Sequence, residues 1–263
     1  MERINQKIQL SKQKLTSLPF RKIAPNIVTL LALCAGVTSI RYSIQADWAK
    51  AVICVFIAAF FDLLDGRVAR MLKGSTKFGA ELDSLSDCIS FGVAPAIMIY
   101  QWTMFDLPKF GWFFCLLLTV GMAMRLARFN TMLEDEPQPE YWNHFFVGVP
   151  APAAAALVMM PIMISFDFPE YDWLLRSNAF CAVWLVIVTF LMVSRIPTFS
   201  TKKLKVPTYL MMPMMLVVAL FATFMITQPW FTLGLLTVLY AISIPVGVAV
   251  FFREKKAFES TRR

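Results

Sequence analysis

The sequence predicts an all-α protein, a polytopic bundle of about eight transmembrane helices with both termini on the cytoplasmic side. Three observations lead to this prediction. The 263 residues are 58% hydrophobic with a mean hydropathy of +0.63, long apolar stretches recur from residue 23 to residue 252, and basic residues gather on one side of the expected bundle. A soluble core of this length could not bury so much apolar surface, so we expect the chain to lie in a membrane.

The expected spans follow from the length of each apolar stretch. A helix needs roughly 20 apolar residues to cross the hydrocarbon core, and stretches of about this length occur at residues 25–43, 49–72, 79–102, 109–130, 148–167, 177–198, 208–227 and 230–252. Pro229 leaves almost no loop between the last two. The predicted organisation is therefore a basic arm over 1–22, one transmembrane domain over 23–252 and a basic tail over 253–263.

The distribution of Lys and Arg predicts the orientation. An even number of spans puts both termini on one side, together with the turn over 73–78. The opposite side holds few of the 25 Lys and Arg residues: Arg41, Lys50, Lys109 and Arg176. By the positive-inside rule, the termini and this turn are expected to be cytoplasmic.

The net charge of +8 and the cysteine pattern argue against several classes of protein. No basic domain stands apart from the spans, so no nucleic-acid partner is expected. The five cysteines lie in apolar stretches without a CxxC pair, which supports neither a disulfide framework nor a zinc site. The single histidine, His144, lies in an acidic loop and is assigned no catalytic role.

The N-terminal arm has two readings that the sequence leaves open. Apolar residues recur at helical spacing among its basic residues, which is the pattern of a helix lying on an anionic membrane surface. A disordered basic tail fits the composition equally well.

Four carboxylates lie inside expected spans, where a charge costs on the order of 3 kcal/mol even on lenient insertion scales. Asp62 and Asp65 share one face of the second span with Ala69, and Asp83 and Asp87 are four residues apart in the third. Both pairs lie near the cytoplasmic ends of antiparallel neighbours joined by a short turn, so we expect them to converge.

Oxygen ligands without nearby His or Cys favour a hard divalent cation, Mg²⁺ or Mn²⁺, held by all four aspartates together with phosphate oxygens. Gly66 and Gly79 would allow the backbone to approach a bulky ligand closely. The alternative is that the aspartates only form ion pairs with basic residues at the headgroup level: Arg67, Arg70, Lys73 and Lys77.

The segment from Asp62 to Asp87 reads D-x-x-D-G-x-x-A-R-x8-G-x-x-x-D-x-x-x-D, with every fixed position filled. This pattern resembles the signature of the CDP-alcohol phosphatidyltransferases, which are membrane enzymes and homodimers. The resemblance implies that Asp87 is the general base toward the acceptor alcohol, at a site that opens to the cytoplasmic side of a bacterial inner membrane. It also implies which residues position the CDP group of CDP-diacylglycerol and its metals: Asp62, Asp65, Gly66, Ala69, Arg70, Gly79 and Asp83.

The acceptor is indicated by weaker blocks at residues 91–96, 125–130, 148–154 and 194–199, which resemble the family members that use L-serine. A serine pocket needs a cation for the carboxylate. Arg128 is the first candidate and Arg125 the second, with Asn130 close by, although both arginines would also suit anchoring at the membrane interface. Asn26, in the opening block 25–29, is either a ligand of phosphate or ribose or a polar helix start.

Two other functions remain open at this stage. A sister enzyme would use glycerol 3-phosphate or inositol, although a phosphate acceptor calls for more clustered Arg and Lys than the fourth span supplies. A divalent-cation transporter would also carry carboxylates in its spans, but usually near the bilayer midplane at broken helices.

Overall fold

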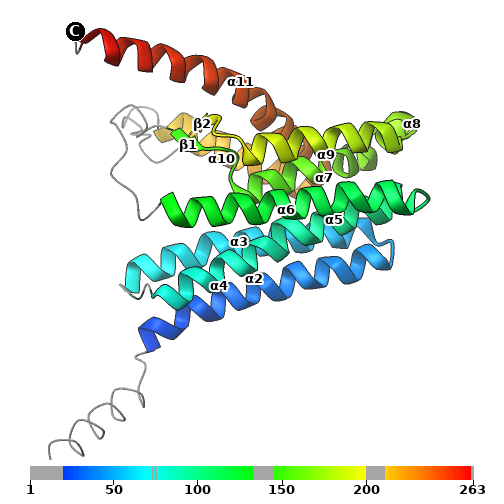
Figure 1. The fold of residues 1–263 in the computed structure, drawn as a ribbon, viewed down its shortest axis with the longest axis horizontal. Helices are drawn as coiled ribbons and strands as arrows, with labels where there is room; N and C mark the ends of the chain where they lie inside the picture. The colour runs from blue at the N-terminus through cyan, green and yellow to red at the C-terminus, as the bar shows by residue number, and fades with distance from the viewer. Residues whose placement is uncertain (1–19, 73, 75, 133–144, 200–210, 262–263) are drawn as a thin grey trace, which may run out of the picture.

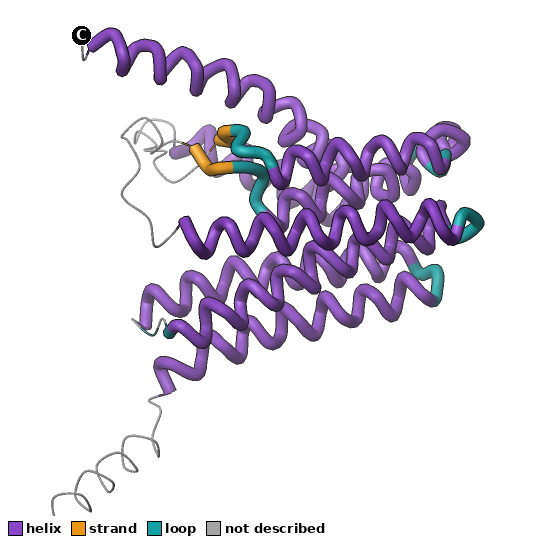
Figure 2. Tube along the Cα trace, viewed as in Figure 1, coloured by secondary structure: helices purple, strands orange, loops and turns teal. Residues whose placement is uncertain are grey.

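The structure is a computed structural model that describes residues 20–72, 74, 76–132, 145–199 and 211–261. It is almost wholly helical, which confirms the all-α prediction (Figures 1 and 2). The helices are α2 (Phe20–Ile44), α3 (Trp48–Leu72), α4 (Lys77–Asp87), α5 (Ala94–Ile99), α6 (Pro108–Met132), α7 (Ala151–Asp167), α8 (Asp172–Leu175), α9 (Asn178–Val193), α10 (Met211–Thr227) and α11 (Pro229–Thr261), with the π-helical segments η1 (Cys88–Val93) and η2 (Tyr100–Met104) and the 3-10 turn η4 (Pro169–Tyr171).

A helix lies over each predicted span, but not every helix is long and apolar enough to cross a membrane. In the part of the chain that the structure describes, four helices qualify by length and composition, at Ile23–Ile44, Lys77–Met104, Pro108–Thr131 and Pro229–Arg253. The segment from α7 to α8, bent by 117°, would make a fifth. The chain is therefore an integral membrane protein. The number of spans expected from the sequence, eight, stays a prediction. Helix α3 does not qualify as a candidate span because Lys50 and the charges after Phe61 interrupt its apolar stretch. Helices α9 and α10 are too short to qualify.

The helices form two layers on either side of α6 (Figure 1). On one side α2 packs along α3 and against α4 and α5, and on the other α7 packs against α9 and α11. The crossing of α2 with η1 is close: a Cβ on Gly36 would lie 2.3 Å from Ser90 Oγ. Small residues let membrane helices approach in this way. Large buried side chains of α5, α6 and α7, such as Met98, Leu118 and Leu157, fill the centre.

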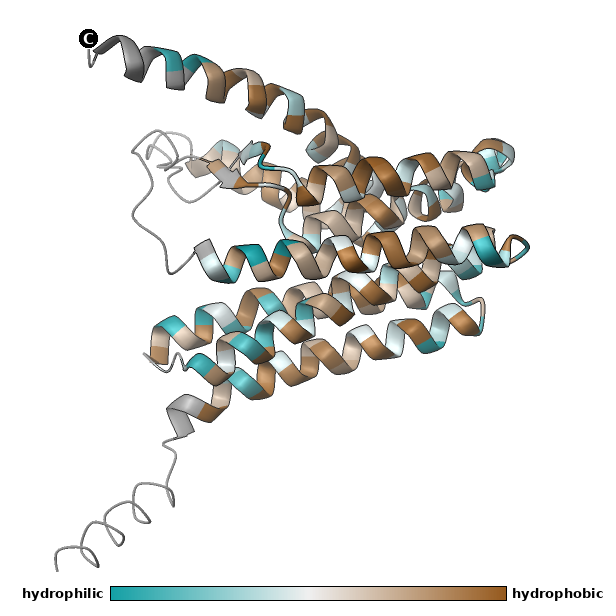
Figure 3. Cartoon of the chain, in the orientation of Figure 1, coloured by the Kyte–Doolittle hydropathy of each residue, from teal (hydrophilic) through white to brown (hydrophobic). Residues whose placement is uncertain are grey.

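The start of α2, the turn between α3 and α4, the end of α6 and the C-terminal end of α11 lie at one end of the bundle (Figure 1). Hydrophilic residues of α3, α4 and α6 gather at this same end (Figure 3). A feature that the sequence did not predict also lies there. The strands β1 (Phe145–Val147) and β2 (Pro197–Phe199) pair antiparallel, with Phe145 opposite Phe199. They form a short ribbon, because each is only three residues long.

Helix α10 differs from the rest because none of its residues is buried, and its main packing partner is α11. The expectations for the arm over 1–19, for Lys73 and for the loop that holds His144 fall outside the described residues.

Candidate active site

The four predicted aspartates lie on facing segments of α3 and α4. Asp62 and Asp65 belong to the last turns of α3, and α4 begins at Lys77 after a short turn. Thr76 caps α4, since its hydroxyl accepts a hydrogen bond from the Gly79 N–H at 3.0 Å. Asp87 is the last residue of α4, directly before the π-helical segment η1. Such π-helical turns inside α-helices often occur at functional sites.

Three of the four aspartates form a tight cluster. One carboxylate oxygen from each of Asp62, Asp83 and Asp87 lies within 4.8 Å of the other two. Carboxylates this close repel one another unless a cation or a proton lies between them. A set of oxygen donors at this spacing fits a hard divalent cation. The predicted convergence of the two pairs is therefore seen for these three residues.

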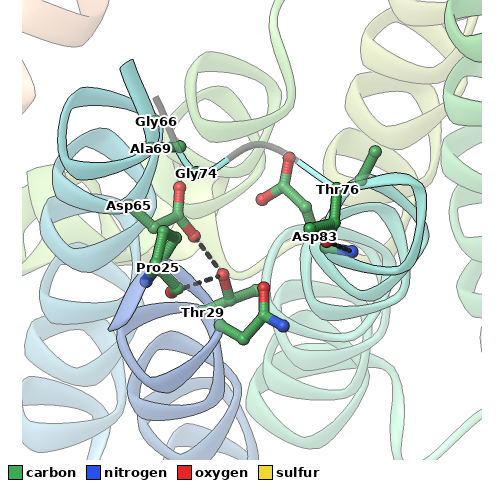
Figure 4. Close-up of a pocket in the computed structure, with 11 residues that line it drawn as sticks. Pro25, Thr29, Asp65, Gly66, Ala69, Gly74, Thr76 and Asp83 are labelled. Carbon is green, nitrogen blue, oxygen red and sulfur yellow. Dashed lines mark hydrogen bonds between the residues drawn. The ribbon is translucent and has the colours of Figure 1, made fainter. Parts of the chain in front are cut away.

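Asp65 lies beside this cluster and takes part in a different contact. Its Oδ2 accepts a hydrogen bond of 2.6 Å from the Thr29 hydroxyl of α2, which also lies 3.2 Å from the Pro25 carbonyl oxygen. Figure 4 shows Asp65 and Thr29 on one wall of a pocket and Asp83 on the other. Asp65 is thus held by a protein partner, which distinguishes it from the three clustered aspartates.

This pocket has a volume of about 140 Å³ and lies between α2, α3 and α4 (Figure 4). Its lining includes the predicted residues Asn26, Asp65, Gly66, Ala69, Gly79 and Asp83. It also includes residues that the sequence did not single out for the site: Pro25, Thr29, Gly74, Thr76 and Ala80. Helical spacing gave a signal for one of them, because Thr29 lies three residues after Asn26 and shares its helix face.

The two glycines of the motif have different surroundings. A Cβ on Gly79 would lie 2.8 Å from Asn26 Oδ1 and 3.1 Å from Thr76 Oγ1, so this glycine makes room for the Asn26 side chain. A Cβ on Gly66 would meet only Arg70 Nη1, at 3.6 Å, which is an ordinary contact. Helix packing therefore does not require a glycine at position 66. Gly66 instead lines the pocket, where the lack of a Cβ leaves more space.

The described residues do not support the alternative in which the aspartates only form ion pairs with nearby cations. Within the described ranges, ion pairs join Lys50 to Asp47 and Arg176 to Asp172, both at the opposite end of the bundle. Arg67, Arg70 and Lys77 form none with the motif aspartates, and Lys73 lies outside the described residues. No described protein cation therefore pairs with the carboxylates of the cluster, which leaves them available to bind a cation from outside the chain.

The residues predicted for the acceptor pocket differ in how firmly the protein holds them. Arg128 donates hydrogen bonds to the Val193 and Ser194 carbonyl oxygens at the end of α9. Asn130 Nδ2 donates to Ser84 Oγ at 3.0 Å, which joins α6 to α4. Among the described residues, Arg125 is bound only through Nε, to the Val149 carbonyl oxygen at 2.7 Å.

Arg125 is also the arginine that faces the aspartates. Its guanidinium interacts electrostatically with Asp87 and, more weakly, with Asp62, but it forms no ion pair with either within the described residues. The two Nη groups make no hydrogen bond in the part of the chain that the structure describes. Two parallel donors are thus free for a planar anion.

The ribbon brings three of the weaker sequence blocks together. Gly148 N–H donates to the Ile196 carbonyl oxygen at 2.8 Å, and the Thr198 hydroxyl donates to the Gly148 carbonyl oxygen at 2.8 Å. Gly148 has a φ of +78°, which favours glycine, and a Cβ there would lie 3.5 Å from Arg128 Nη2. The blocks over 125–130, 148–154 and 194–199 therefore meet beside the aspartates.

Comparisons with known proteins agree with this geometry. The family model described as CDP-alcohol phosphatidyltransferase matches residues 22–193, and one described as CDP-alcohol phosphatidyltransferase 2 matches residues 209–245. The chain is similar to proteins named CDP-diacylglycerol--serine O-phosphatidyltransferase. That of Mycobacterium leprae is 37% identical over 86% of this chain and 75% of its own length. Those of Helicobacter pylori and Bacillus subtilis are 33% and 30% identical, over 69% and 65% of this chain and 73% and 87% of theirs.

Proposed function

Because this chain belongs to the CDP-alcohol phosphatidyltransferase family, we propose that it transfers the phosphatidyl group of CDP-diacylglycerol to the hydroxyl of L-serine and releases CMP. The observation that carries the proposal is the cluster of Asp62, Asp83 and Asp87 between a pocket on one side and, on the other, Arg125, whose Nη groups make no hydrogen bond within the described residues. The relatives named for this reaction support the choice of serine.

The pocket between α2, α3 and α4 is proposed to hold the CDP group. Asn26 and Asp65 offer polar side chains, Gly66 and Ala69 offer a face without bulk, and Arg70 extends over Gly66. Gly79 and Asp83 form the facing wall. This assignment keeps the positions that the motif predicted for nucleotide binding except Asp62, which is not part of the pocket lining and is proposed as a metal ligand instead.

A divalent cation, Mg²⁺ or Mn²⁺, is proposed at the aspartate cluster, with Asp62, Asp83 and Asp87 as ligands and Asp65 at its edge. When bound, such a cation neutralises charge on the pyrophosphate. The chemistry of the donor set and the absence of protein cations paired with it in the described ranges support this proposal.

Asp87 is proposed as the general base. A serine hydroxyl is a weak nucleophile at neutral pH, so a carboxylate within hydrogen-bonding reach must accept its proton as the oxygen attacks phosphorus. The new O–P bond then forms as the bond from phosphorus to the CMP oxygen breaks, and CMP leaves with the electron pair. The position of Asp87 supports this role because, among the clustered aspartates, it interacts most strongly with Arg125, the residue proposed to hold the acceptor, so the acceptor hydroxyl would lie beside it.

Arg125 is proposed to receive the serine carboxylate, ahead of Arg128. Arg128 is already bound to two carbonyl oxygens, whereas Arg125 keeps both Nη groups free within the described residues. Asn130 supports the site from the α4 side through Ser84.

We propose that the site faces the cytoplasm from a bacterial inner membrane. The described cations at the aspartate end include Arg67, Arg70, Lys77, Arg125, Arg128, Arg195, Arg253 and Lys256, whereas the opposite end has Arg41, Lys50, Lys109 and Arg176. The positive-inside rule supports this orientation. A homodimer, which membership of the family implies, is proposed as the assembly.

The proposal is tested by giving the purified protein CDP-diacylglycerol and labelled L-serine, glycerol 3-phosphate or inositol in parallel. We expect label to become lipid-soluble with serine and one CMP to be released for each lipid formed. A reaction without CDP-diacylglycerol is the control. Label in lipid only from glycerol 3-phosphate or inositol would assign the chain to a sister activity.

A further inference from the structure

Tyr240 of α11 is a polar residue near the site that the mechanism above does not use. Its hydroxyl oxygen is buried and has no hydrogen-bond partner among the described residues. The Thr198 hydroxyl of β2 is close enough to interact with it, and because it donates its own proton to the Gly148 carbonyl oxygen at 2.8 Å it could only accept from Tyr240, but the two hydroxyls do not have the geometry of a hydrogen bond. A buried hydroxyl without a partner is costly and is rarely kept unless a ligand or a water satisfies it.

The position of Tyr240 relative to Arg125 suggests which ligand that is. Tyr240 lies near enough to Arg125 for the charge of the guanidinium to act on its hydroxyl group, and Arg125 in turn interacts with Asp87. Three side chains from α11, α6 and α4 therefore follow one another from the buried phenol to the proposed general base. Tyr240 and Arg125 can both donate hydrogen bonds, so a ligand that binds both of them is expected to be an anion.

We propose that Tyr240 is a specificity-determining residue that donates its hydroxyl proton to the carboxylate of the acceptor, beside the Nη groups of Arg125. This inference rests on the proposed function, since it names the contact by which an amino-acid acceptor is distinguished from an alcohol without a carboxylate. A carboxylate has two oxygens with four lone-pair directions and can accept from both residues. The serine hydroxyl then points toward Asp87.

The surroundings of Tyr240 argue against a purely packing role. Tyr240 packs against the hydrophobic core of the bundle, to which Ile244 of α11 also belongs. A phenylalanine would meet the needs of such surroundings without leaving a polar atom unpaired. The hydroxyl therefore needs a function that packing does not supply.

The test is Tyr240→Phe in the full-length protein, because this change removes one oxygen and little else. We expect the KM for serine to rise about ten- to a hundredfold, as for loss of a hydrogen bond to a charged group, with kcat and the KM for CDP-diacylglycerol changed less than about twofold. Tyr171→Phe, on an exposed tyrosine at the opposite end of the bundle, is the matched control.

A second measurement separates recognition from chemistry. L-alanine keeps the carboxylate and ammonium groups but lacks the hydroxyl, so its inhibition constant against serine reports binding alone. This constant is expected to rise in Tyr240→Phe by the same factor as the KM for serine. An unchanged KM and inhibition constant, or an equal rise in the KM of both substrates with a lower melting temperature, would overturn the role of Tyr240.

These outcomes are distinct from failure of the proposed function. If wild type and Tyr171→Phe make lipid from serine while Tyr240→Phe shows a normal KM, only the Tyr240 inference fails. If wild type makes no lipid from serine, the proposed acceptor is wrong, and the inference falls with it.

Discussion

The two sides of the site are built in different ways. The side toward α2 and α3 takes most of its groups from one continuous segment, Asp62 to Asp87, and α2 adds Asn26 and Thr29. The side toward α6 and α11 is assembled from residues far apart in the chain, with Arg125, Val149 and Tyr240 as examples. The side proposed for the nucleotide is thus encoded locally, whereas the side proposed for the acceptor depends on the whole bundle. Changes in acceptor choice can therefore arise without altering the aspartates.

The two sides also differ in how their charges are satisfied. Clustered aspartates have no protein cation paired with them in the described ranges, whereas Arg128 and Arg125 are tied to backbone carbonyl oxygens. The first side therefore needs positive charge from outside the chain, and the second is held in place by the fold itself. Experiments on the two sides should give different kinds of loss.

Removal of divalent metal should have the largest effect, and it acts on the first side alone. A chelator is expected to abolish transfer, because clustered carboxylates without a cation repel a pyrophosphate. Added Mg²⁺ or Mn²⁺ should restore it. The melting temperature, measured on the same samples, should persist within a few degrees because packing holds the helices together. Full activity in metal-free protein would contradict the proposed metal site.

Asp87→Asn should have the next largest effect. The amide keeps the size of the side chain and its ability to hydrogen-bond but is not a base, so turnover is expected to fall at least about a hundredfold. Binding of CDP-diacylglycerol, measured by its retention on the purified variant, should survive in part. Turnover at the wild-type rate would show that another group accepts the proton.

The sequence predicted more of the side toward α2 and α3 than of the side toward α6 and α11. The motif predicted the aspartates, the glycines and their convergence, because helical spacing and a short turn determine which residues of α3 and α4 face each other. It did not predict that Asp65 would be held by Thr29, since that contact joins α2 to α3.

The acceptor side was harder to predict, because two candidate arginines three residues apart look alike in sequence. Only the carbonyl oxygens at the end of α9 distinguish the bound Arg128 from the freer Arg125. Tyr240 gave no signal, since a tyrosine in an apolar helix is common at membrane interfaces. The ribbon of β1 and β2 was missed for a similar reason: its strands are short and lie some fifty residues apart, as the Thr198–Gly148 hydrogen bond shows.

Replacing each arginine by lysine should distinguish the two candidates. Lysine keeps the charge but loses the planar pair of donors, so Arg125→Lys is expected to lower kcat/KM for serine about tenfold or more, with little change in the KM for CDP-diacylglycerol. Arg128→Lys should mainly lower the melting temperature, because it loses bonds to Val193 and Ser194. Initial rates at varied serine and CDP-diacylglycerol measure both effects. If instead Arg128→Lys lowers kcat/KM for serine and Arg125→Lys does not, Arg128 binds the serine carboxylate. Equal losses for both substrates in both variants would indicate that the two arginines are anchors at the membrane interface.

The smallest effect is expected from Gly66→Ala, which tests whether the bare face of α3 serves a ligand. A Cβ there meets only Arg70 Nη1 at 3.6 Å, so the fold accepts it, and alanine in a helix interior is favoured over glycine by about 0.5–1 kcal/mol. The variant should thus melt at the same temperature as wild type or slightly higher. Its KM for CDP-diacylglycerol should nevertheless rise several-fold, because the added methyl group occupies the pocket wall.

Gly36→Ala is the matched control for that substitution, since a Cβ at this position would lie 2.3 Å from Ser90 Oγ and 2.7 Å from Ser90 Cα. This glycine is needed for packing of α2 against η1, so its replacement should lower the melting temperature. Thermal melts and substrate titrations of both variants make the comparison. A Gly66→Ala variant that melts lower, or one that binds CDP-diacylglycerol as wild type does, would show that the glycine at position 66 serves the helix rather than the nucleotide.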